Sequence, residues 1–93
     1  MNVECNFFGP FRETVGTKTI ERECPPGTIL IELIDDLETD YEGIAGQLLA
    51  EEGKLKENIS ITVDSEHVRQ LDEEETELAD GSVVRFAPPV SGG

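Results

Sequence analysis

Few side chains in this sequence could take part in catalysis, and the most suggestive group is Ser65, Glu66 and His67. A Ser-His-acid triad needs three side chains that converge in space, whereas consecutive residues of an extended segment point to alternate sides. A single histidine beside a turn is more typical of an exposed surface position. The sequence also contains neither of the glycine-rich loops that bind nucleotide phosphates. These residues therefore do not predict an enzyme.

Cysteines and acidic residues give little support for a metal site. Cys5 and Cys24 are too few for a cysteine-ligated iron–sulfur cluster or a four-cysteine zinc site. We expect both to be reduced, buried and small apolar side chains. The acidic run 72–75 could attract divalent cations weakly, but it lacks the glycine and ligand alternation of a calcium loop. We expect it to form a solvated face.

The end of the chain offers a different kind of chemistry. Seven residues follow Phe86, and at roughly 3.3 Å each they can extend about 23 Å, far enough to enter a cleft of another protein. Pro88 and Pro89 favour extended polyproline geometry at the base of this arm. Gly92 and Gly93 lack side chains, so a narrow channel could close round the backbone and leave a terminal carboxylate open to attack. The alternative is a frayed terminus, in which glycine is common.

Length and charge limit the possible partners. The 93 residues are enough for one small domain, and 7 Lys and Arg against 21 Asp and Glu give a net charge of −14. Such a chain has no basic surface for phosphate backbones or anionic lipid, and no apolar run approaches the roughly 20 residues of a membrane span. We expect a cytoplasmic monomer that binds neither nucleic acid nor membranes.

The excess of acids also suggests a habitat. At roughly 1 M salt the Debye length is about 3 Å, so repulsion that would strain the fold in dilute buffer is nearly abolished. The scarcity of lysine, represented only by Lys18, Lys54 and Lys56, points the same way. We favour a salt-rich cytoplasm, with an ordinary acidic protein as the alternative.

Hydrophobic periodicity predicts the elements of the first half. Alternating apolar residues predict a strand over 1–8, and β-branched residues predict a second over 17–24, joined through a polar connection as a hairpin. Thr28 stands where a helix N-cap belongs. The helix after it carries one apolar stripe and should lie across the hairpin. That stripe consists of Leu30, Leu33, Ile34 and Leu37.

The second half is predicted to add further strands. Residues 40–57 allow a short helix around Ile44, Leu48 and Leu49. Alternation over 59–63 predicts a strand that turns into a second short strand over 67–71, and a tight turn then leads into a final strand over 82–86. The order β-β-α-β-β(-β) indicates an α+β domain, a mixed sheet with one main helix on one face.

Two segments resemble a known family. Residues 7–16 (FFGPFRETVG) are similar to the aromatic strand end, helix-like turn and glycine near the start of the MoaD/ThiS ubiquitin-like proteins, and residues 86–93 (FAPPVSGG) resemble their C-terminal signature almost residue for residue. The helix after Thr28, the strand over 59–63 and the turn over 78–82 fall in the family's order. Together with the acidity, the chain looks most like a small archaeal modifier protein of a halophile.

The resemblance implies a β-grasp (ubiquitin-like) fold over residues 1–87, with four to five strands on one helix, and a flexible tail over 88–93. It also implies that the chain is a substrate and binds no cofactor. The carboxylate of Gly93, preceded by Gly92, would be activated by a separate E1-like enzyme that uses ATP and magnesium. An acyl-adenylate is a far better acyl donor than a free carboxylate, because its leaving group is a stabilised phosphate.

Two fates of that adenylate are implied, and they belong to different functional classes. A persulfide could leave a C-terminal thiocarboxylate that delivers sulfur for molybdopterin or tRNA thiolation, or a target-protein lysine could form an isopeptide bond. We expect a modifier and sulfur carrier. The alternatives are a dedicated small subunit of molybdopterin synthase, which would partner that enzyme's large subunit, and a non-covalent docking domain.

Contacts with the activating enzyme are expected at the tail and its base. The candidates are Phe86, Pro88, Pro89, Val90 and Ser91. For Phe86 the sequence leaves core packing equally open, because alternation places it on the same side as the core-facing Val84.

Overall fold

The chain folds around one mixed β-sheet. The computed structural model describes residues 1–44, 46–49, 54–56 and 59–88. Five strands form the sheet in the order β2-β1-β5-β3-β4. They are β1 (Asn2–Phe7), β2 (Thr19–Glu23), β3 (Ser60–Val63), β4 (Glu66–His67) and β5 (Val83–Ala87).

The last strand occupies the centre of the sheet. β5 pairs in parallel with β1, with Phe86 opposite Phe7, and antiparallel with β3, with Ala87 opposite Ser60. β1 and β2 form the expected antiparallel pair. Alternate residues of β5 are buried, as are Val3, Cys5 and Phe7 of β1, since successive side chains of a strand point to opposite faces. Asn6, on the other face of β1, is buried as well. The predicted mixed sheet is thereby confirmed.

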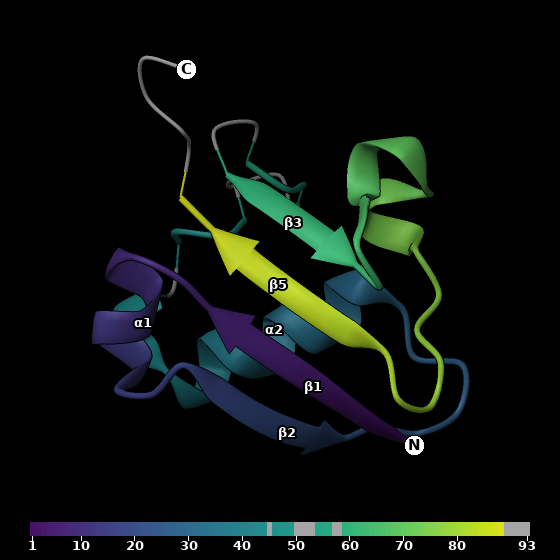
Figure 1. The fold of residues 1–93 in the computed structure, drawn as a ribbon, viewed down its shortest axis with the longest axis horizontal. Coiled ribbons are helices and arrows are strands. Elements are labelled where there is room, and N and C mark those ends of the chain that lie inside the picture. Colours follow the sequence, from purple (N-terminus) through teal and green to yellow (C-terminus); the bar gives the residue numbers. More distant parts are fainter. Residues whose placement is uncertain (45, 50–53, 57–58, 89–93) are drawn as a thin grey trace.

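One long helix covers one face of the sheet. α2 (Leu30–Asp40) lies behind the strands in Figure 1. It buries all four residues of the predicted apolar stripe: Leu30, Leu33, Ile34 and Leu37. Each large apolar side chain removed from water in this way contributes about 1.5–3 kcal/mol before the entropy cost of ordering it.

The predicted cap of this helix is wrong. Ile29, not Thr28, precedes the first helical residue, and the Ile29 amide donates to Glu32 Oε1 at 3.0 Å. The Thr28 hydroxyl instead donates to the Pro25 carbonyl at 2.7 Å. That bond closes the turn between β2 and α2. The free amide at the start of the helix is satisfied by the Glu32 side chain and not by Thr28.

The segment between β1 and β2, predicted as a polar connection, contains a helix. α1 (Pro10–Val15) has proline at its first position, where the missing amide proton costs no helical hydrogen bond. It ends at Gly16, whose φ of 91° is left-handed. Phe11 anchors the helix in the core. The resemblance to a helix-like turn was the better guide here.

The predicted strand over 67–71 is also mostly wrong. β4 comprises only Glu66 and His67, and the chain then turns into a short 3₁₀ helix, η2 (Val68–Gln70). Val68 is buried, which turns this segment toward the core rather than along the sheet edge. A second 3₁₀ helix, η3 (Glu73–Glu75), contains most of the acidic run.

The region 40–57 is described in part. A 3₁₀ helix, η1 (Glu42–Ile44), stands where a short helix was predicted, and Ile44 and Leu48 are buried. Leu49 pairs with Leu55 in an isolated bridge. Residues 45, 50–53 and 57–58 lie outside the described residues.

Candidate functional site

The described chain ends at the base of the predicted reactive arm. We call Phe86, Ala87 and Pro88 the tail root. Backbone pairing holds its first part on both sides, because the Phe8 amide donates to the Phe86 carbonyl at 3.0 Å and Ala87 lies opposite Ser60. In Figure 1 this end of the sheet, where β1 and β5 both finish, lies beside α1. The tail root is therefore fixed to the most central part of the fold.

Phe86 is a core residue. Its side chain is 0% exposed and stacks on Phe7, with the ring centroids 5.2 Å apart and the planes 11° from parallel. Of the two possibilities that the sequence left open, the structure shows core packing. A partner protein cannot reach this ring in the folded state.

Pro88 packs on a residue that sequence reasoning did not select. Gly9, between β1 and α1, has a φ of 59°, and a Cβ built there would lie 2.9 Å from Pro88 Cγ and 3.3 Å from Pro88 Cδ. Real Cβ atoms do not come so close, so only glycine leaves room for the ring in this position. The sequence signal was the pair Gly9-Pro10, which follows the predicted strand over 1–8 and lies within the segment 7–16 that carries the family resemblance.

The remaining predicted site residues lie outside the described residues. These are Pro89, Val90, Ser91, Gly92 and Gly93. Their predicted roles, and the boundary between a domain over 1–87 and a tail over 88–93, stay predictions.

The two cysteines are free and buried, as expected. Burial raises the pKa of the Cys5 thiol to about 12, with smaller contributions from Cys24 and Glu4 that outweigh the opposing charge of Arg22. Burial also raises the pKa of Cys24, and the charge of Asp36 adds to it. A thiol that keeps its proton at neutral pH is a poor nucleophile. Neither cysteine is therefore prepared to attack a thioester or a disulfide.

The residues that suggested a triad have structural partners instead. His67 Nδ1 accepts a hydrogen bond from the Arg69 amide at 3.2 Å, and Ser65 Oγ accepts one from Arg85 at 3.4 Å. In the acidic run, Glu74 accepts from the Leu55 amide at 3.1 Å. Across the part of the chain that the structure describes, no three His, Cys, Asp or Glu side chains are grouped to hold a metal ion.

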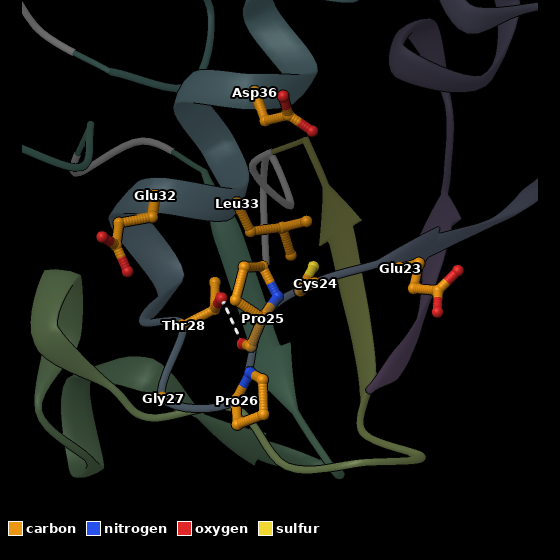
Figure 2. A pocket seen from close by; sticks show the side chains of 9 residues that line it. All are labelled: Glu23, Cys24, Pro25, Pro26, Gly27, Thr28, Glu32, Leu33 and Asp36. Carbon is orange, nitrogen blue, oxygen red and sulfur yellow. Dashed lines mark hydrogen bonds between the residues drawn. The ribbon is translucent and has the colours of Figure 1, made fainter.

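An open hollow of about 440 Å³ lies between the end of β2 and the start of α2. Figure 2 shows Glu23, Glu32 and Asp36 around it with their carboxylates pointing in different directions, and Cys24 and Leu33 supply apolar surface. The hollow is at the end of the sheet where β1 begins, whereas the tail root is where β1 finishes. About 17 Å of strand separates the two, so the hollow is no part of the tail-root site.

Comparison with known proteins decides the family. A family model described as the ThiS family matches residues 5–93. The chain belongs to the ThiS family. Its five-stranded sheet and main helix have the ubiquitin-like β-grasp fold, as the resemblance implied. Within the described residues of this ThiS-family protein, no helix has the length and apolar composition needed to cross a membrane.

The relatives of this ThiS-family protein carry two kinds of name. It is 37% identical over 93 residues, all of both chains, to small archaeal modifier protein 3 of Haloferax volcanii. It is also 37% identical to the sulfur carrier protein CysO of Mycobacterium tuberculosis over 82 residues, 86% of this chain and 85% of CysO. These relatives are small modifier or carrier proteins rather than catalytic enzymes.

A solved structure of a complex is also similar. The crystal structure of the BexX/CysO complex of Amycolatopsis orientalis matches with a TM-score of 0.81 and 33% identity, covering 98% of this chain and 99% of that chain. A structure of this fold has thus been solved together with a partner protein.

Proposed function

We propose that this protein is a ubiquitin-like modifier and sulfur carrier whose reacting group is the carboxylate of Gly93. The observation that carries the proposal is the full-length 37% identity to a named archaeal modifier, together with equal identity to a named sulfur carrier. The buried, protonated cysteines support it, because they leave the chain without a reactive thiol of its own.

Activation is assigned to a separate E1-like enzyme with ATP and magnesium. A Gly93 carboxylate oxygen attacks the α-phosphorus of ATP, pyrophosphate leaves, and an acyl-adenylate remains. In the carrier route, the terminal sulfur of an enzyme persulfide displaces AMP to form an acyl disulfide, and a second thiol reduces it to the thiocarboxylate while a disulfide forms between the two thiols. In the modifier route, a lysine amine displaces AMP and loses a proton. Both routes belong in the cytoplasm.

The test is the mass of the protein from its own cells. We expect a free pool in which sulfur replaces one terminal oxygen, and we expect peptides of larger proteins in which Gly93 is joined to lysine. A matched control lacks Gly92 and Gly93, and it should keep its thermal midpoint while losing both signatures. If the truncated protein still formed an adenylate with the activating enzyme, the assignment of the carboxylate would be wrong.

A dedicated sulfur carrier is the second candidate, favoured by the identity to CysO. It predicts the thiocarboxylate without branched peptides, even under oxidative or sulfur-limited growth. A small subunit of molybdopterin synthase is one form of this candidate, and co-purification with a large subunit would identify it. Finding neither signature would leave a non-covalent docking domain.

A further inference from the structure

Two segments from opposite ends of the chain meet at the tail root. Gly9 follows β1, and Pro88 follows β5, which pairs in parallel with β1. The ladder hydrogen bonds continue to the Phe86 carbonyl, which accepts from the Phe8 amide. Pro88 is half-buried and has no amide proton to extend the ladder, but its ring lies so near Gly9 that a Cβ there would be 2.9 Å from Pro88 Cγ. Packing replaces hydrogen bonding at the point where the chain leaves the sheet.

This contact restricts the direction of departure. The residue before a proline is biased toward extended backbone, and proline fixes its own φ near −65°, so few rotations remain at Ala87 and Pro88. The contact with Gly9 restricts them further, because only some of the remaining backbone rotations at Ala87 and Pro88 keep the Pro88 ring against Gly9. Five residues after Pro88 can span about 16 Å, so a change of about 20° at the base displaces the end of an extended arm by about 5 Å.

We propose that Gly9 is a positioning residue for the C-terminal carboxylate, because it provides the space in which Pro88 sets the direction of the arm. This inference rests on the proposed function, in which an adenylating enzyme must bring that carboxylate to ATP. The reaction is sensitive to such displacement, since a misplacement of about 1 Å can cost about 100-fold in rate. Gly9 acts through Pro88 and does not itself touch the reacting atoms.

The two glycines that flank α1 supply a variant and its control. Gly9→Ala adds a Cβ that collides with Pro88 and also strains a backbone with a φ of 59°. Gly16→Ala, at the other end of the same helix, strains a backbone with a φ of 91°, but nothing lies within 4 Å of its Cβ. The two strains are not equal, because Gly9 has a ψ of −136° whereas Gly16 has a ψ of −1° in the ordinary left-handed region. Gly16→Ala therefore controls for the loss of a glycine at an end of α1, and the Pro88→Ala background controls for the strain at Gly9.

The experiment measures ATP–pyrophosphate exchange with the activating enzyme of the same host, using full-length protein and separating kcat from KM. We expect Gly9→Ala to lower kcat/KM by about tenfold, mainly through kcat. The loss should be smaller than for a rigid group, because bond rotations within the arm can partly restore the position of the carboxylate. Gly16→Ala should change it less than twofold. In a Pro88→Ala background, where the ring is absent, adding Gly9→Ala should cost little more.

Several outcomes would overturn the inference. Equal losses for Gly9→Ala and Gly16→Ala would assign the effect to the loss of a glycine at an end of α1, and independent, multiplicative effects of Gly9→Ala and Pro88→Ala would show that the two residues do not act through one contact. If Gly9→Ala does not fold, Pro88→Ala decides alone, because it removes the ring without straining Gly9, and wild-type kcat for that variant would refute the inference. Failure of the proposed function looks different: the wild-type protein itself would give no exchange.

Discussion

At the scale of single residues, the buried Cys5 thiol makes the stability of the fold depend on pH. Its side chain is fully buried, and its pKa rises from an ordinary 9.0 to about 12. The folded protein therefore keeps a proton that the unfolded chain releases above pH 9. Linkage then makes the stability contributed by this group complete below pH 9 and progressively lost as the pH rises from 9 toward 12.

We predict that Cys5→Ala flattens this alkaline loss. The variant should be less stable at pH 7, by about 1 kcal/mol for the lost packing, yet its free energy of unfolding should decline less between pH 9 and 11. Urea midpoints at both pH values measure it, and alkylation should label Cys5 of the native protein only on unfolding. Parallel declines in the variant and the wild type would show that Cys5 does not titrate in this way.

Single residues also show which features of the site the local sequence can predict and which it cannot. The two cysteines were predicted to be reduced and buried because their apolar strand context is local. Gly9 was not selected, because its contact with Pro88 joins two residues almost the whole chain apart, and its left-handed φ of 59° is not visible in the sequence. Thr28 was predicted to cap the helix because a threonine precedes the apolar stripe. A threonine at this position can equally close the preceding turn, as its bond to the Pro25 carbonyl does.

At the scale of elements, one arginine ties the edge of the sheet to the main helix. Arg22 of β2 forms ion pairs with Asp36, at 3.2 Å, and with Asp40, both on α2. Its guanidinium carbon also lies 5.8 Å from the centre of the Tyr41 ring. Each exposed pair of this kind contributes about 0.2–1 kcal/mol, so their combination holds α2 against β2 only modestly.

We predict that Arg22→Ala destabilises the protein by about 1–2 kcal/mol in dilute buffer, through the lost pairs and the lost packing of the side-chain stem. Arg22→Lys should lie between, since lysine keeps the charge but not the planar fork. Arg12→Ala, on an exposed position of α1, removes the same charge as a control. Urea denaturation measures all three, and equal losses for Arg22→Ala and Arg12→Ala would contradict the interpretation.

The elements that the sequence predicted are those with a long local period. The stripe of α2 and the alternation of β1, β3 and β5 each repeat several times, whereas α1 has only six residues and completes fewer than two turns. β4 gives way to η2 at Val68, the first residue of η2, which is buried in the core, and the local sequence does not indicate that burial.

At the scale of the whole molecule, net charge should govern stability. A charge of −14 on 93 residues repels itself, and raising the salt concentration from about 0.1 M to about 1 M shortens the Debye length from about 10 Å to about 3 Å. The same change weakens the exposed Arg22 pairs, but two pairs are a small term beside the surplus of 14 negative charges.

We therefore predict that the midpoint of thermal unfolding rises with salt, most steeply below about 1 M, where screening changes most. A variant in which the exposed residues Glu21, Glu23 and Glu77 are replaced by glutamine should show a shallower rise. A flat or falling wild-type series would remove the argument for a salt-rich cytoplasm and leave acidity as an aid to solubility.

The central place of β5 also has a consequence for the order of events during synthesis. The strand made first, β1, pairs in the middle of the sheet with a strand made near the end, so the ribosome must deliver residues 83–87 before the core can close. Until then, β1–β2 and β3–β4 are two separate hairpins, and an isolated hairpin is marginal in water. Closing a loop of almost the whole chain is slow. We therefore expect the molecule to fold late and as a unit, and the strand that completes its core is the one from which the arm extends.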